Sequence, residues 1–201
     1  LPRLGMPPVY ATRLTQGLIA IKLKEHRLLD TARLQTIQAG DSISLGSFQI
    51  EFFHVSHSIP DGVGLALHTP IGTVVHSGDF KFDHTPVDGR LTDFAKLASL
   101  GQQGVLVLLS DSTNADSPGY TPSEKLVGEM FDHVFSRAPK RIIIATFASN
   151  ISRIQQIVDA ALRYDRRVGI VGRSMVENVR MARDLGYLDV PEGVLLRLDE
   201  L

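Results

Sequence analysis

The sequence has no cysteine, no apolar run long enough to cross a membrane, and no basic-then-apolar leader at its start. Without cysteine, disulfides and thiolate metal sites are excluded. Because no run approaches the roughly 18 apolar residues of a membrane span, we expect a soluble protein, with the cytoplasm as its location. The 201 residues, 43% hydrophobic and 21% charged, are enough for one large or two small domains with a buried core.

The net charge of −1 indicates no particular partner, but the basic residues are unevenly distributed. Between Arg137 and Arg183 the chain has ten basic and three acidic residues, so this window carries +7 and the remainder −8. Nine of the ten are arginines, whose planar guanidinium binds phosphate at two points. The window therefore favours nucleic-acid binding. The alternative is that these are exposed helix arginines that contact nothing.

The first 120 residues predict short strands separated by turns. Strands are expected at residues 17–22, 48–55, 63–69 and 73–76, where segment length and composition suit them. A short helix is expected over Leu91–Leu100. The apolar run Gly104–Leu109 predicts a strand that is covered on both faces.

The second half alternates helices and strands. Thr121-Pro122-Ser123-Glu124 has the form of a capping box at the start of a helix. A strand at 141–146, a helix at 150–163, a strand at 167–171 and a helix at 174–185 follow. This alternation with short connections predicts a parallel sheet. A boundary is expected near Tyr120.

Five of the seven histidines lie between His54 and His84 in the strand-rich half, interleaved with Asp61, Asp79 and Asp83. Imidazole and carboxylate groups suit zinc or another divalent cation when cysteine is absent. His57 and Asp79 each follow a predicted strand, where a rigid scaffold presents functional groups. His54, His68 and His76 lie within strands, where a structural role is expected.

Six segments, in order along nearly the whole chain, match one known family. They are Val9-Tyr-Ala-Thr-Arg-Leu-Thr-Gln-Gly-Leu18, His57-Ser-Ile-Pro-Asp61, Ser77-Gly-Asp-Phe-Lys81, Ser110-Asp-Ser-Thr-Asn-Ala115, Thr146-Phe-Ala-Ser-Asn150 and Gly172-Arg-Ser-Met175. Together they resemble the metallo-β-lactamase/β-CASP nucleases, and among them the ribonuclease J family.

The resemblance implies an α/β fold in two parts. Residues 1–120 would form a metallo-β-lactamase αββα sandwich without its N-terminal portion, and residues 121–201 the start of an inserted β-CASP domain without its C-terminal portion. The implied activity is metal-dependent hydrolysis of RNA phosphodiester bonds. It would combine 5′-to-3′ exonuclease action, favouring RNA with a 5′-monophosphate end, with endonuclease action in RNA processing and decay.

The resemblance also implies roles for three residues. His57 matches a ligand to one of two divalent metal ions, and Asp79 a carboxylate that bridges both. Asp111 matches an acid that supports a ligand histidine or the attacking water. Zinc is the expected metal, with manganese or magnesium also suited to such ligands. Taken without the resemblance, Asp79 reads as a turn residue and Asp111 as a helix or turn cap.

The sequence also departs from the family pattern. The motif His-x-His-x-Asp-His is absent and is expected upstream of Leu1, and the later β-CASP histidine motifs are expected beyond Leu201. With two of the expected ligands, the chain is predicted to be an internal fragment that is inactive alone. Ser152 stands where many relatives have histidine. The intact protein is expected to be a homo-oligomer or part of an RNA-degradation complex, and the alternative function is a catalytically inactive RNA-binding scaffold.

Two strand-to-helix junctions are candidate RNA-binding sites. Ser149 and Asn150 stand at a predicted helix N-terminus, where free amides and the helix dipole attract phosphate. Arg173 and Ser174 repeat the arrangement at the next helix. The alternative is that Ser149, Asn150 and Ser174 only cap their helices. Phe147 is expected to lie in the core rather than to stack on a base.

Overall fold

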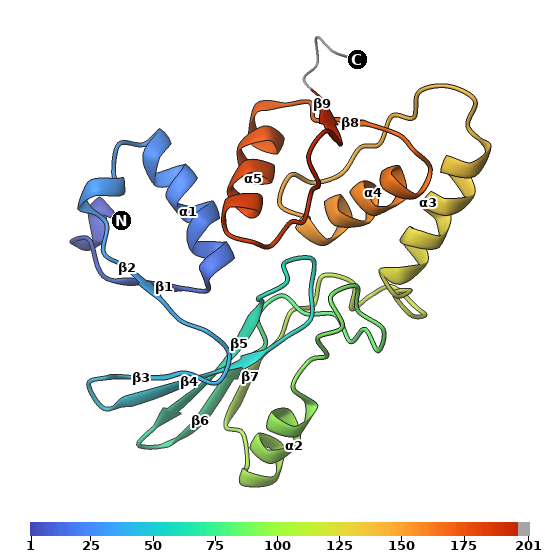
Figure 1. Ribbon diagram of the computed structural model, residues 1–201. Coiled ribbons are helices and arrows are strands. Elements are labelled where there is room, and N and C mark those ends of the chain that lie inside the picture. Colours follow the sequence, from blue (N-terminus) through green and yellow to red (C-terminus); the bar gives the residue numbers. More distant parts are fainter. Residues whose placement is uncertain (197–201) are drawn as a thin grey trace.

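The structure, a computed structural model, describes residues 1–196 and has the expected α/β class (Figure 1). The helices are α1 (Arg13–Glu25), α2 (Phe94–Gln103), α3 (Lys125–Arg137), α4 (Ile151–Arg163) and α5 (Arg173–Asp184), with short 3-10 turns at Pro2–Leu4 and Leu29–Thr31. The strands are β1 (Val9–Ala11), β2 (Leu34–Thr36), β3 (Ser42–Leu45), β4 (Phe48–His54), β5 (Val63–Thr69), β6 (Gly72–His76), β7 (Val107–Leu109), β8 (Val168–Gly169) and β9 (Leu195–Leu196). Within residues 1–196, none of the helices has the length and apolar character needed to cross a membrane.

A five-stranded sheet of order β3-β4-β5-β6-β7 dominates the first half. β3 to β6 are antiparallel neighbours, and β7 joins β6 in parallel. Phe53, Ala66 and Val75 form the buried face, on which Leu100 of α2 packs. The predicted strands at 48–55, 63–69 and 73–76 are confirmed, and the predicted helix at 91–100 is confirmed as α2, shifted by three residues.

The second half is helical, with a small parallel sheet. α3 packs on α4 through Phe135 and Ala161, and β8 pairs with β9 in parallel. The helices expected at 150–163 and 174–185 are confirmed as α4, which begins one residue later than predicted, and α5, which is shifted one residue towards the N-terminus. The parallel sheet predicted for this half is present as this one pair within residues 1–196.

The strand predicted at residues 17–22 is wrong, because these residues lie in the middle of α1. α1 packs on α5, and Gly17 is the point of closest approach. A Cβ atom at Gly17 would lie 2.5 Å from the sulfur of Met181. Burial of Leu14 against Val179 and Ala182 of α5 outweighs the strand preference of the isoleucines in this segment.

Two further strand predictions are wrong in part. No strand is assigned over residues 141–146, although Ile142 and Ile144 pack inward and Ile143 is 96% exposed, as alternation along an extended segment requires. The segment keeps the strand pattern without a ladder partner. β7 is shorter than predicted, and its residues are exposed rather than covered on both faces. It is an edge strand that is paired with β6 alone in the described chain.

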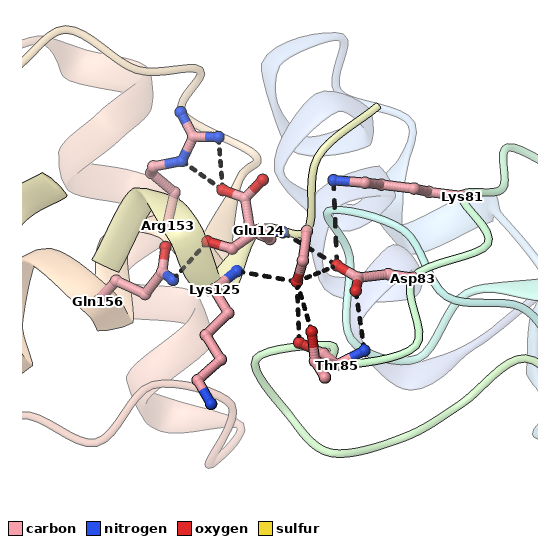
Figure 2. Close-up of polar contacts among 8 residues, drawn as sticks. Lys81, Asp83, Thr85, Glu124, Lys125, Arg153 and Gln156 are labelled. Carbon is pink, nitrogen blue, oxygen red and sulfur yellow. Dashed lines mark hydrogen bonds and ion pairs between the residues drawn. The ribbon is translucent and has the colours of Figure 1, made fainter. Parts of the chain in front are cut away.

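The two halves meet at the buried carboxylate of Asp83 (Figure 2). One oxygen of Asp83 accepts hydrogen bonds from the Ser123 hydroxyl and the Glu124 amide, both at 2.9 Å, and the other accepts one from the Thr85 amide at 2.9 Å. Glu124 in turn pairs with Arg153 of α4. The predicted capping box is therefore wrong, because an aspartate 40 residues earlier, rather than Thr121, satisfies the start of α3.

We predict that Asp83→Ala lowers the free energy of unfolding by about 2 kcal/mol, because the hydrogen bonds that Thr85, Ser123 and Glu124 donate to this buried carboxylate are lost. Burial alone would raise the pKa of Asp83, but the hydrogen bonds from Thr85, Glu124 and Ser123 hold the pKa below its ordinary value of 3.8. The contribution is therefore complete above about pH 5 and is lost as the pH falls through and below 3.8. Urea unfolding at pH 7 and pH 3 measures both effects.

The control is Asp88→Ala, which removes an exposed carboxylate from the same loop and should cost less than about 0.5 kcal/mol. Equal stability losses in the two variants, or a loss at Asp83 that is the same at both pH values, would contradict the bridging role.

Candidate functional site

β4, β6 and β7 run in the same direction, because β5 is antiparallel to both of its neighbours and β7 is parallel to β6. Their carboxyl ends therefore lie at one edge of the sheet. His57, Asp79 and Asp111 follow these three strands, each within three residues of the strand end. Figure 1 shows this edge facing α4 and α5. The topology thus gathers the three strand-end residues on one side.

The turn that presents Asp79 depends on Gly78. Gly78 has a φ of 65°, and a Cβ atom there would lie 2.5 Å from the carbonyl oxygen of Val63. A larger residue would force β5 and β6 apart. Beyond the turn, the Lys81 amide donates to the carbonyl of Ser56 at 2.7 Å. This bond joins the loop that carries Asp79 to the loop that carries His57.

The carboxylate of Asp111 is held by three donors. The hydroxyl and the amide of Thr113 donate to one oxygen at 2.7 and 3.0 Å, and the amide of Phe80 donates to the carboxylate as well. The Thr113 hydroxyl is the largest cause that holds the pKa of Asp111 below its ordinary value, and the nearby His57 imidazole acts in the same direction. Asp111 therefore lies close both to His57 and to Phe80, the residue that follows Asp79.

The loop of His57 also contacts the second half. The imidazole is exposed, but Ser56 before it donates its amide to the Thr92 hydroxyl at 3.0 Å. Ile59 after it packs against a buried cluster that includes Leu14 and Ile151. Ile151 is the first residue of α4. The sheet edge and the start of α4 therefore meet through this loop.

At the start of α4, the predicted cap is confirmed. The side chain of Asn150 accepts from the Arg153 amide at 3.0 Å, and the carbonyl of Ser149 accepts from the Ile151 amide at 2.9 Å. The amide of Ser152 has no acceptor among the described residues. The Asn178 side chain of α5 donates to the carbonyl of Ala148 at 3.0 Å and fixes this junction against α5.

The start of α5 differs from the prediction. Its N-cap is Gly172, so the capping role considered for Ser174 is wrong. Arg173 is 77% exposed and pairs with Glu177 at 3.2 Å and Glu25 at 4.0 Å, across the contact between α5 and α1. The core position expected for Phe147 is also wrong, because Phe147 is 83% exposed.

Comparisons with known proteins bear on this arrangement. Residues 139–201 match the family described as Ribonuclease J, beta-CASP domain. Ribonuclease J of Synechocystis sp. is 46% identical over 98% of this chain, and that of Thermus thermophilus is 48% identical over 96%. The chain belongs to the ribonuclease J family. It spans about a third of the length of these curated relatives, 31% and 34% respectively.

One solved structure shares the fold at low sequence identity. It is described as a protein of unknown function from Enterococcus faecalis V583, and it covers 96% of this chain with a TM-score of 0.67 at 14% identity. The chain corresponds to 50% of that structure. This likeness concerns the fold alone.

The metal ligands implied by the ribonuclease J resemblance do not form a complete site in the described chain. Within residues 1–196, no group of three or more His, Asp or Glu side chains is arranged to hold a metal ion. His57 and Asp79 supply one imidazole and one carboxylate, whereas zinc sites use three or four protein ligands. These residues therefore fit a metal only if further ligands join them.

Three other histidines have the structural roles expected of them. The buried ring of His54 lies between the carbonyls of Gly62 and Arg90, at 3.1 and 3.3 Å. His68 contacts the Thr73 hydroxyl, and His76 accepts from the Gly78 amide at 3.0 Å.

Most arginines of the basic window make contacts within the chain, so the alternative that these arginines contact nothing is wrong. Two of the arginines connect loops through hydrogen bonds. Arg166 donates to the carbonyls of Ala138 and Lys140, and Arg167 donates to the carbonyl of Gly193. Ion pairs or hydrogen bonds with helix side chains occupy Arg137, Arg153, Arg163, Arg173 and Arg180. RNA binding by the exposed members stays a prediction.

Sequence reasoning grouped Asp61 and Asp83 with the metal-binding pattern, but the structure uses both as hydrogen-bond acceptors between distant segments. Asp83 accepts a hydrogen bond from the Glu124 amide at the start of α3. Asp61 accepts hydrogen bonds from the Leu14 amide at the start of α1 and from the Tyr187 hydroxyl. No local signal identifies such partners, because Tyr187 lies 126 residues from Asp61.

We predict that Thr113→Val raises the pKa of Asp111 part of the way to its ordinary value, because the hydroxyl donor is lost while the amide donors remain. A pH titration of the Asp111 carboxyl carbon resonance by NMR measures the shift. Thr121→Val is the control, since this exposed threonine makes no side-chain hydrogen bond within the described chain. An unchanged pKa in Thr113→Val would contradict the geometry given above.

Proposed function

We propose that the full-length protein, in which this chain is continued to the length of its relatives, is a metal-dependent ribonuclease that hydrolyses RNA phosphodiester bonds. The 201 residues alone are proposed to be inactive, since His57 and Asp79 are fewer ligands than a catalytic metal site uses. The relatives named Ribonuclease J supply the substrate class for this proposal.

The observation that carries the proposal is the gathering of His57, Asp79 and Asp111 at one sheet edge, with the His57 loop packed on the start of α4. An imidazole and carboxylates at the ends of adjacent strands can bind a divalent cation once further ligands join them. Asp111, ionised at neutral pH and close to His57, suits a positioning role in which a carboxylate orients a ligand imidazole.

Two divalent ions, zinc in the first instance and manganese or magnesium otherwise, would supply a hydroxide nucleophile and stabilise the leaving oxygen. In this proposal His57 would hold one ion and Asp79 would hold both. Asp111 does not bind metal directly. Its hydrogen bonds from Thr113 and Phe80 hold the carboxylate in place while the substrate is bound.

The proposed RNA-binding residues lie at the starts of α4 and α5. The amide of Ser152 lacks an acceptor among the described residues, and Ser149 lies beside it, so a phosphate oxygen can approach this helix end. Asn150 contributes by fixing the helix start, and Arg173 with Ser174 would bind a second phosphate at α5. Exposure leaves Arg173 free to exchange its surface ion pairs for phosphate.

The finer parts of the proposal follow from the resemblance. They are 5′-to-3′ exonuclease action on RNA with a 5′-monophosphate end, endonuclease action, a role in RNA processing and decay, and work in the cytoplasm as a homo-oligomer or within an RNA-degradation complex. The proposed domain division, residues 1–120 and 121–201, puts the matched segment 139–201 inside the second part.

We predict that Asp79→Ala in the full-length protein abolishes RNA cleavage while leaving RNA affinity within about threefold, because the metal ligand is lost but the phosphate-binding residues remain. The measurements are cleavage of a labelled RNA and RNA binding by filter retention. The control is Asp30→Ala, which removes an exposed carboxylate from the turn at Leu29–Thr31 and should cleave normally.

Retained cleavage by Asp79→Ala would overturn the role of Asp79. A different outcome bears on the whole proposal: if the unaltered full-length protein binds RNA but does not cleave it with zinc, manganese or magnesium, the inactive RNA-binding scaffold replaces the nuclease.

A further inference from the structure

The loop that carries His57 is anchored by Asp61, four residues later. One carboxylate oxygen of Asp61 accepts two hydrogen bonds, from the amide of Leu14 at the start of α1 and from the hydroxyl of Tyr187 just after α5, each at 2.9 Å. The partners lie 47 and 126 residues away in the sequence. The side chain of Asp61 therefore joins the sheet edge to the start of α1 and to the segment that follows α5.

The carboxylate of Asp61 depends on these two hydrogen bonds to offset the free-energy cost of its partial burial. Its second carboxylate oxygen is buried and accepts no hydrogen bond from any described residue. Hydrogen bonds to a charged acceptor are stronger than neutral ones, and removing one donor from a buried carboxylate is costly. Burial and the bond to Asp61 raise the pKa of Tyr187 to about 12, so its hydroxyl keeps the proton it donates at neutral pH.

Ile59 adds an apolar contact between the same two anchors. Its side chain packs against the cluster of Leu14 and Ile151, and Ile151 follows the proposed phosphate-binding residue Asn150. Residues 57–61 are thus fixed on one side by the sheet and on the other by α1, α4 and the segment after α5. The exposed imidazole of His57 takes its position from these flanking contacts.

We propose that Asp61, with Tyr187 as its partner, is a positioning residue that sets the place of His57 relative to the start of α4. The inference rests on the proposed function, since it links the residue expected to bind metal with the helix end expected to bind RNA phosphate. The spacing between these two groups decides which phosphodiester bond reaches the strand-end residues, and misplacement of a reacting group by about 1 Å costs up to a hundredfold in rate.

The test uses Tyr187→Phe and Asp61→Asn in the full-length protein, with single-turnover cleavage at saturating RNA and RNA affinity measured in the presence of a chelator. We expect the cleavage rate to fall about tenfold in Tyr187→Phe and further in Asp61→Asn, while RNA affinity stays within about twofold. The matched control is Tyr164→Phe, which removes a hydroxyl from a tyrosine whose ring packs on Phe135 instead. Its cleavage should be normal.

A second readout does not need cleavage. In protein labelled with ¹³C-histidine, Tyr187→Phe should shift the ring resonances of His57 and leave those of His133 on α3 unchanged, whereas Tyr164→Phe should not move His57. If the unaltered protein fails to cleave RNA, the proposed function fails, and the His57 resonances still decide the positioning role. Normal cleavage in both folded variants, an equal loss of RNA affinity and cleavage, or an unmoved His57 resonance would each overturn the inference.

Discussion

The direction of three strands is the constraint on which the site depends. Because β4, β6 and β7 all run the same way, their ends bring His57, Asp79 and Asp111 to one edge, although 54 residues separate the first from the last. Reversal of any one strand would send its residue to the opposite edge. The loops at this edge are then cross-linked by backbone bonds, such as that from the Lys81 amide to Ser56, so the strand-end residues stay together without a bound ion.

Two carboxylates, the buried Asp83 and the half-buried Asp61, attach this part of the sheet to helical segments. Asp83 accepts a hydrogen bond from the backbone amide at the start of α3, and Asp61 accepts one from the start of α1 and one from the Tyr187 hydroxyl. Each accepts its hydrogen bonds at a partly buried position, so the loss of a contact costs free energy. The basic residues expected to face RNA take part in the same assembly, since several of them tie helices and loops together instead of remaining free.

The elements that depend on a local sequence pattern were predicted correctly. The strand at Val63–Thr69 and the Asn150 cap follow from composition and spacing within a few residues, and the strand-end residues were identified by family resemblance. What failed depends on distant partners. Residues 17–22 have strand-like composition, yet the glycine in α1 allows close packing on α5. Residues 141–146 have the alternation of a strand but no ladder neighbour in the described chain, and nothing near Asp61 in the sequence indicates its bond to Tyr187.

The sheet edge and the start of α4 are proposed to form one RNA site. The sharpest test is a crystal structure of full-length Asp79→Ala bound to a short single-stranded RNA. We expect one phosphate at the start of α4, beside Ser149 and Asn150, with the RNA strand continuing past Ile59 to the edge between His57 and Asp111. RNA bound on another surface, such as the exposed segment around Ile143, would contradict it.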